Sequence, residues 1–324
     1  MAIIFDEQNK TFTIHTEHST YQMQIDPYGV LLHLYYGRKT KGCMDYLLQK
    51  QDRGFSGNLY DAGNDRTYSL DVLPQEFPTW GTGDYRSTAL IVRGQDGTTA
   101  CDLRYRGYRI LSGKYGLSGL PAVYGAEKEA QTLEVVLEDG RTGIQVTLLY
   151  GVLPKYDVIT RSAQIINTKE NIIYLEKAAS ACLDFVTGKY DVISFYGRHA
   201  MERNYQRIPV SHGNYVIGSR RGTSSHQYSP FLILTEEGTT EDAGACYAMS
   251  FVYSGGFQAE VGKRPVRAEQ NADGVAAGAV FVSSEYRRSL CHTGNRDDLQ
   301  QKRAGRAFPE SAPVFSEQSV QGPS

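Results

Sequence analysis

The sequence predicts an all-β protein, built as a large antiparallel β-sandwich with a poorly ordered C-terminal tail. Three observations support this fold class. Short apolar runs alternate with period 2, turn residues separate them at hairpin-like intervals, and no segment keeps a helical period over about 15 residues. Many strands without intervening helices favour antiparallel sheets packed face to face over βαβ units.

The first expected strands lie near the N-terminus. Segment 11–16 (TFTIHT) places Phe12 and Ile14 on one face, and segment 21–25 (YQMQI) repeats this alternation. Segment 31–37 (LLHLYYG) is almost continuously apolar, which is typical of a strand covered on both sides. Further strands are expected in ALIVRG, TLEVVLED, IQVTLLYGV, DVITRSAQII, IIYLEKAASACLDF, FLILTEE and CYAMSFVYS. Segment 42–52 (GCMDYLLQKQD) is the one candidate for a helix, of two turns.

The length of the strand-rich part sets the size of the sandwich. An immunoglobulin-like sandwich needs only about 100 residues, so strands throughout residues 1–260 predict an oversized sandwich, or two merged ones. Residues 261–324 differ in composition and in residue pattern, because they hold only one of the 23 tyrosines and show no strand or helix period. Within them only segment 271–284 is expected to be ordered, and segment 305–324 reads as disordered.

Composition excludes several classes of protein. A net charge of −2 gives no electrostatic basis for a nucleic-acid or anionic-membrane partner. No apolar run reaches about 18 residues, and the N-terminus lacks the pattern of a secretory signal. An odd number of scattered cysteines without CxxC spacing argues against a zinc ribbon or a disulfide scaffold and suits a reducing cytoplasm. We therefore expect a cytoplasmic globular protein with no metal and no cofactor.

The section 51–86 is the first candidate for a functional site. It is long for a loop and rich in Asp, Arg and aromatic residues, and long loops in compact domains are usually functional or disordered. Carboxylates and guanidinium groups bind sugar hydroxyls, and rings cover the apolar face of a sugar. The alternative is that Asp52–Arg53 and Asp84–Arg86 are local ion pairs that fix the loop.

Two further segments are polar enough to contact a ligand. In segment 194–207, His199 and Glu202 form a candidate acid/base or metal pair, but the HExxH spacing is absent and a structural or ligand-contacting role fits better. Segment 218–231 (GSRRGTSSHQYSPF) reads equally as a recognition loop or as turn-capping residues. No pair of carboxylates stands out as a catalytic pair, so no catalytic residue is assigned.

Taken together and in order, several motifs resemble the N-terminal domain of bacterial α-galactosidases of glycoside hydrolase family 36. The resemblance covers about residues 3–260. Its motifs are FSGN…DRTYSLDVLPQEFPTWGTGDYR, GLPAVYGAEKEAQTLEVVLED, DVITRSAQIIN, RRGTSSHQYSPF and FVYSGGF. The resemblance implies a β-supersandwich that precedes a catalytic (β/α)8 barrel, and retaining hydrolysis of terminal α-galactosyl residues in sugars such as melibiose and raffinose.

The resemblance also implies where the chemistry resides. Both catalytic aspartates of the family lie on the barrel, which needs about 250 residues, and only residues 261–324 follow the matching part. We therefore expect this chain to be inactive alone. Its function would be that of a scaffold, oligomerisation and substrate-loop domain, with a stand-alone carbohydrate-binding or interaction module, or a non-functional truncated product, as alternatives.

Two residues carry the substrate-loop role that the resemblance implies. In tetrameric members, sandwich loops reach the sugar site of a neighbouring subunit through an Asp in a segment like LDRAFS and a Trp in a segment like GAWGRER. Here the segments read QDRGFS and GRHAMER, so Asp52 matches the Asp and His199 replaces the Trp. We expect Asp52 to accept hydrogen bonds from galactose, while His199 is either a weaker substrate contact or an ordinary sandwich residue.

The resemblance ends abruptly at Glu260–Val261, inside a segment that reads as a strand. A natural linker would follow a completed strand. We therefore expect a domain over 1–260 and, over 261–324, an aberrant or disordered tail read out of frame. Translation of the downstream DNA in the other two frames tests this expectation.

Overall fold

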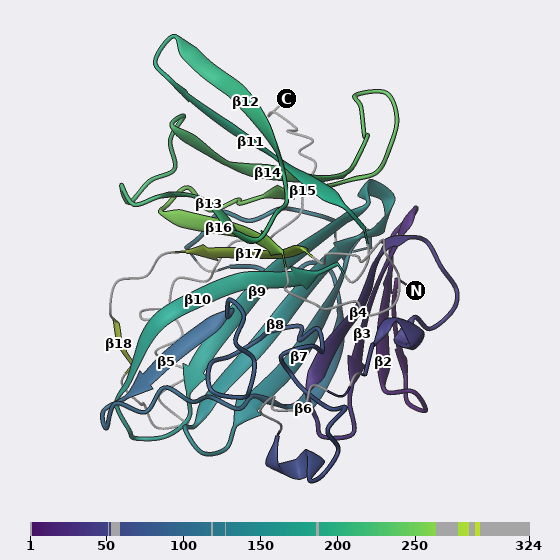
Figure 1. The fold of residues 1–324 in the computed structure, drawn as a ribbon, viewed down its shortest axis with the longest axis vertical. Helices are drawn as coiled ribbons and strands as arrows, with labels where there is room; N and C mark the ends of the chain where they lie inside the picture. Colours follow the sequence, from purple (N-terminus) through teal and green to yellow (C-terminus); the bar gives the residue numbers. More distant parts are fainter. Residues whose placement is uncertain are drawn as a thin grey trace.

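The computed structural model describes residues 2–50, 52, 59–117, 119–126, 128–185 and 188–263, together with the backbone of 278–284 and 289–291. Its regular structure is almost entirely β-strand, arranged in antiparallel sheets (Figure 1). The predicted all-β class is therefore confirmed. The predicted poorly ordered tail lies largely outside the described residues.

Two of the sheets are simple meanders in which each strand pairs with the next. The N-terminal sheet consists of β1 (Ile3–Asp6), β2 (Thr11–His15), β3 (Ser19–Ile25) and β4 (Leu31–Arg38). The second meander consists of β6 (Arg104–Ser112), β7 (Gln131–Asp139), β8 (Ile144–Leu153) and β9 (Val158–Asn167). Short hairpin connections explain this order for every pair except β6 and β7, since they can join only antiparallel neighbours.

The other two sheets contain the later strands. One has the order β13 (Gly213–Ser219), β16 (Phe257–Lys263), β17 (Gly278–Ser284), β10 (Ile173–Asp184) and β18 (Ser289–Cys291), and β5 (Leu90–Gly94) also pairs with β10. The last sheet has the order β12 (Met201–Pro209), β11 (Tyr190–Arg198), β14 (Tyr228–Glu236) and β15 (Cys246–Ser250). Single 3₁₀ turns occur at η1 (Asp45–Leu47), η2 (Tyr60–Ala62) and η3 (Pro154–Tyr156).

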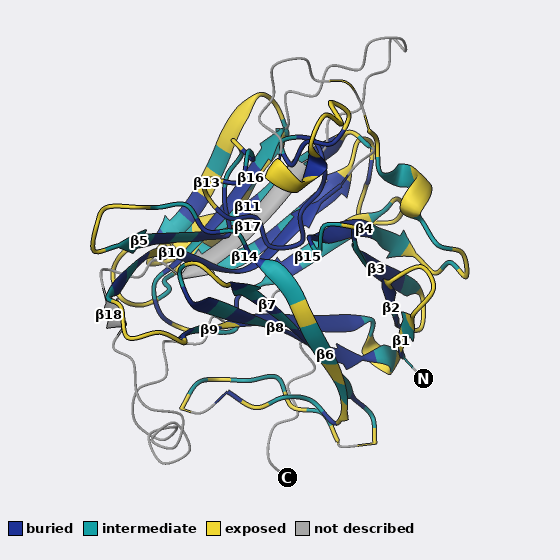
Figure 2. Ribbon diagram, turned by 90° about the horizontal axis from the view of Figure 1, so that it is seen from below, coloured by how far each residue is buried: buried dark blue, intermediate teal, exposed yellow. Residues whose placement is uncertain are grey.

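One hydrophobic core joins all four sheets. On β7 the alternating residues Leu133, Val135 and Leu137 point inward, because successive side chains of a strand lie on opposite faces. Their cross-strand neighbours on β8 include Leu148 and Tyr150, which are also fully buried. Figure 2 shows these buried strands in dark blue, with exposed residues in the connecting segments and on β6. The strand β12 is also largely exposed.

Strand pairing continues beyond position 260. β16 runs to Lys263 and has a partner on each side, β13 and β17. Val261 lies opposite Val280, and β17 in turn pairs with β10. Segment 271–284, expected to hold the ordered part of the tail, thus contains β17. The division at position 260 stays a prediction.

The predicted strands are confirmed, whereas the predicted two-turn helix at 42–52 is wrong. In the described part of that segment the only helical element is η1, which is a single 3₁₀ turn. The side chain of Gln22 donates to the carbonyl of Gly42 and accepts from the backbone N–H of Met44, each at 3.0 Å. These two bonds hold the start of the segment beside β3, and they pair its backbone groups with a side chain instead of with a helical turn. No helix in the described residues is long and apolar enough to cross a membrane.

Candidate functional site

The polar loop, defined as residues 39–89 between β4 and β5, carries Asp52, and its described residues are attached to the N-terminal sheet. It has a small hydrophobic core of its own, made of Val30, Leu32, Leu59, Ala62, Tyr68, Leu70 and Leu73. Backbone hydrogen bonds attach it to β4, from His33 N–H to Pro74 at 2.7 Å and from Glu76 N–H to Leu31 at 3.0 Å. The loop is therefore positioned by the sandwich.

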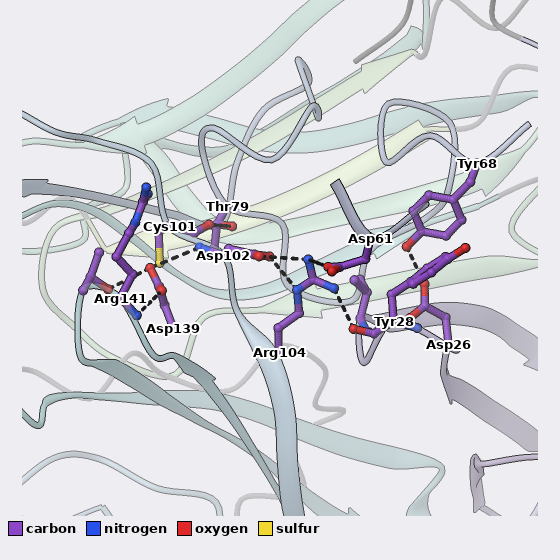
Figure 3. Close-up of polar contacts among 12 residues, drawn as sticks. Asp26, Tyr28, Asp61, Tyr68, Thr79, Cys101, Asp102, Arg104, Asp139 and Arg141 are labelled. Carbon is purple, nitrogen blue, oxygen red and sulfur yellow. Dashed lines mark hydrogen bonds and ion pairs between the residues drawn. The ribbon is translucent and has the colours of Figure 1, made fainter. Parts of the chain in front are cut away.

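Arg104 attaches η2 of the polar loop to the second meander (Figure 3). Its guanidinium group donates to both carboxylate oxygens of Asp102, at 2.7 and 2.8 Å, and to Asp61 at 3.3 Å. It also donates to the carbonyl of Tyr28 at 2.6 Å. Bidentate guanidinium–carboxylate pairs of this kind fix orientation as well as distance. Close by in Figure 3, the Tyr68 hydroxyl donates to Asp26.

A buried ionic cluster fixes the centre of the polar loop. Glu76 is fully buried and accepts hydrogen bonds from the hydroxyls of Tyr21 at 2.6 Å and Tyr150 at 2.7 Å. Arg161 forms an ion pair with Glu76 at 2.7 Å, and His33 lies 3.1 Å from its other oxygen. Burial alone would raise the pKa of Glu76, but the charge of Arg161 and the bonds from His33 and Tyr21 outweigh it and lower the pKa.

A second ionic cluster fixes the end of the polar loop. Arg86 pairs with Asp84 at 2.5 Å and with Asp184 of β10 at 3.1 Å. Its guanidinium group also donates to the carbonyls of Leu70 and Leu73, both at 3.0 Å. The interpretation of Asp84–Arg86 as a local ion pair that fixes the loop is therefore confirmed.

Asp52 is an exposed residue of the polar loop. Its carboxylate forms an ion pair with Arg66 at 3.1 Å, and the two side chains are 54% and 63% exposed, respectively. The neighbouring Arg53 lies outside the described residues. An exposed carboxylate beside a guanidinium group offers hydrogen-bond acceptors and donors side by side, which is the arrangement that a sugar hydroxyl can use.

His199 lies in the two-residue turn of the β11–β12 hairpin and is exposed. The turn has special backbone geometry, since Ala200 has a φ of 60° and its N–H donates to the Glu202 carboxylate at 2.9 Å. A Cβ atom at Gly197 would lie 2.4 Å from the carbonyl oxygen of Met201, so only glycine fits there. Gly197 and Glu202 therefore shape the hairpin that presents His199.

The two predicted contacts lie on different elements. Asp52 pairs with Arg66 in the polar loop, whereas His199 lies in the turn of the β11–β12 hairpin, which is at the upper end of Figure 1. Among the residues that the structure describes, no three or more His, Cys, Asp or Glu side chains are grouped as metal ligands would be.

Segment 218–231 shows the hydrogen bonds of capped turns. The Ser219 hydroxyl donates to the carbonyl of Thr223 at 2.6 Å, and the Thr223 hydroxyl donates to that of Ser224, also at 2.6 Å. The side chains of Arg221 and His226 are exposed. These contacts favour the turn-capping interpretation of its hydroxyl residues.

Comparison with known proteins identifies the class to which this architecture belongs. The bifunctional α-galactosidase/sucrose kinase AgaSK of Mediterraneibacter gnavus is 61% identical over 263 residues, which are 81% of this chain and 28% of the relative. The solved galactosidase domain of AgaSK superimposes with a TM-score of 0.87 at 52% identity, over 97% of this chain and 41% of that one.

A variant of the α-galactosidase AgaA from Geobacillus stearothermophilus, solved in complex with raffinose, superimposes with a TM-score of 0.82 at 36% identity. That match covers 94% of this chain and 40% of AgaA. The chain thus spans well under half the length of each of these relatives. The fold and the similarity to these relatives together define an all-β domain of a glycoside hydrolase.

The family is shown directly by the sequence. Residues 29–272 match the glycosyl hydrolase family 36 N-terminal domain. The chain belongs to this family.

Proposed function

We propose that this chain acts as the non-catalytic N-terminal domain of an α-galactosidase, where it serves as scaffold, as oligomerisation unit and as carrier of a substrate-contacting loop. The substrate class is terminal α-galactosides such as melibiose and raffinose. The observation that carries the proposal is the exposed Asp52–Arg66 pair on a loop anchored by buried ion pairs. We place the protein in the cytoplasm, where thiols such as those of Cys101 and Cys182 remain reduced.

Rigid support for Asp52 favours a role in recognition. A group that binds a sugar hydroxyl must be held close to its productive position, and neighbouring packing and hydrogen bonds provide this. The Glu76 and Arg86 clusters anchor the polar loop to the sandwich, while Asp52 stays accessible to solvent. The carboxylate then accepts hydrogen bonds from galactose hydroxyls, and its ion pair with Arg66 keeps it oriented.

The location of the two contacts on different elements favours action across subunits. Asp52 lies in the polar loop and His199 in the turn of the β11–β12 hairpin. In a symmetric oligomer, the loop of one protomer and the hairpin of another can approach one sugar site, and a homotetramer is the assembly that we propose. His199 supplies a ring nitrogen as donor there, with less stacking surface than an indole.

A titration with raffinose tests the role of Asp52. We expect millimolar binding by the unaltered chain and about tenfold weaker binding after Asp52→Ala, because a hydrogen bond to a charged group is lost. Glu241→Ala, which removes another exposed carboxylate, should leave binding unchanged. Equal affinity of the unaltered chain and the Asp52→Ala variant, or no saturable binding by either, would contradict the substrate-loop role.

A further inference from the structure

A separate cavity of about 460 Å³ lies where β4, the end of β10 and the last sheet meet. Neither Asp52 nor His199 lines it. This volume is within the usual range for small-molecule sites, which is about 300–1,000 Å³. The side chains that matter for the argument are Tyr35, Tyr46, Tyr247, Glu236, Asp184 and Arg38.

Aromatic rings form one firm wall of the cavity. The ring centroid of Tyr247 lies 4.5 Å from that of Phe185 and 5.3 Å from that of Tyr36. Phe185 in turn contacts Tyr190 at 5.3 Å, and Tyr190 is buried. The Tyr247 hydroxyl donates to the carbonyl of Tyr36 at 3.3 Å, which ties β15 to β4. These rings are therefore held in place before any ligand arrives.

Two more tyrosines lie toward the opening. The Tyr35 hydroxyl donates to the carbonyl of Arg38 at 2.9 Å, so its ring folds back over Gly37. A Cβ atom at Gly37 would lie 2.6 Å from that hydroxyl oxygen, so glycine is needed for this position of the ring. Tyr46 of η1 is 70% exposed although it lines the cavity. Its ring face is thus available to a ligand.

Polar groups of both signs accompany the rings. Glu236 and Arg38 are exposed lining residues, and Asp184 is a buried one whose carboxylate pairs with Arg86 at 3.1 Å. Burial, and then the nearby charge of Glu236, raise the pKa of Tyr190 to about 12, which keeps its hydroxyl protonated as a donor. The cavity therefore presents both acceptors and donors around an aromatic wall.

This combination selects one class of ligand. The faces of aromatic rings carry partial negative charge and attract the C–H groups of a sugar ring, while carboxylates and a guanidinium group bind its hydroxyls. A quaternary ammonium ion also favours aromatic walls, but it has no use for the guanidinium group of Arg38. A neutral polyhydroxylated ring uses all of these groups.

We propose that the cavity lined by Tyr35, Tyr46 and Glu236 is an accessory binding site for one pyranose unit of an oligosaccharide. One sugar ring lies on the tyrosines, and its hydroxyls donate to Glu236 at the opening. Such a site lets the domain hold a saccharide independently of Asp52, and so goes beyond the proposed function.

Calorimetric titration with raffinose in the Asp52→Ala background isolates this site. We expect saturable binding to persist there, with a dissociation constant on the order of 10 mM, which is the weaker binding expected once Asp52 is lost. Adding Tyr46→Ala or Glu236→Gln should weaken it about tenfold, since each removes a stacking face or a charged acceptor. The matched controls Tyr60→Ala, at a ring that is 99% exposed, and Glu237→Gln lie outside the cavity and should change nothing.

Three results would overturn the accessory site. They are loss of all raffinose binding in Asp52→Ala alone, equal binding with and without the Tyr46 and Glu236 changes, and tighter binding of tetramethylammonium than of raffinose. The first result would leave the role of Asp52 standing. Conversely, binding that depends on Tyr46 and Glu236 but not on Asp52 would support the accessory site and contradict the substrate-loop role.

Discussion

Replacing Arg161 with methionine should lower the free energy of unfolding by about 3–5 kcal/mol, the usual effect of removing one partner from a buried ion pair. Arg161 and Glu76 are both at most 1% exposed and lie 2.7 Å apart. Without the guanidinium group, the Glu76 carboxylate is left in the core with only hydroxyl and imidazole partners. Thermal unfolding followed by circular dichroism should show a midpoint lower by roughly 10 °C.

Two further variants separate the loss of charge pairing from the loss of packing. Arg109→Met also removes an ion pair, with Glu134 at 2.5 Å, but Arg109 is 70% exposed and we expect a change of at most about 1 kcal/mol. Combining Arg161→Met with Glu76→Gln should cost less than the sum of the two single changes, because no unpaired charge remains. Additive losses would show that Glu76 and Arg161 do not act as a pair.

Replacing Arg86 with methionine should have an effect of similar size, about 3–5 kcal/mol. The change leaves the buried carboxylates of Asp84 and Asp184 without their guanidinium partner, and it frees the carbonyls of Leu70 and Leu73. Chemical denaturation with urea measures the loss. Arg86→Lys should recover only part of it, since an ammonium group cannot make the same set of planar bonds.

Arg66→Met is the control for this second cluster. Arg66 belongs to the same polar loop, but it and its partner Asp52 are more than half exposed. We expect its loss to cost about 0–1 kcal/mol, as for other surface ion pairs. If the urea midpoint of Arg86→Met differed from that of the unaltered protein by no more than the midpoint of Arg66→Met does, Arg86 would not anchor the loop.

Local alternation made most of the fold predictable. Leu133, Val135 and Leu137 mark the inner face of β7 directly, and the same rule applies to Phe12 and Ile14 on β2. The rule fails for β12, because seven of its nine residues are exposed and no apolar face exists to recognise. That strand is specified by backbone pairing with β11, which a residue pattern does not reveal.

The ion pairs and hydrogen bonds that anchor the polar loop could not be predicted from local sequence patterns, because their partners lie far apart in the chain. The partners of Glu76 lie 55 and 74 positions away at Tyr21 and Tyr150, and Arg161 lies 140 positions from Tyr21. Only the folded sheets bring them together. Conversely, Asp84 and Arg86 are two positions apart, so their pairing could be anticipated.

For Asp52 the sequence suggested a neighbour, and the structure provides a partner further along the loop. Arg53, the partner in the alternative interpretation, lies outside the described residues, and within the described part the carboxylate pairs with Arg66, on the other side of η2. The motif match located the residue, and the fold supplied its chemical environment. For His199, the requirement for glycine at Gly197 follows only from the close approach of Met201 across the hairpin.

Hydrolysis of nitrophenyl α-galactoside by the purified 324-residue chain tests the central claim most directly, namely that this domain contributes binding and support rather than chemistry. A cooperative thermal transition establishes first that the chain is folded, and a full-length family 36 α-galactosidase serves as positive control. We predict no release of nitrophenol above the protein-free blank. Robust turnover that co-elutes with the folded chain would contradict the account.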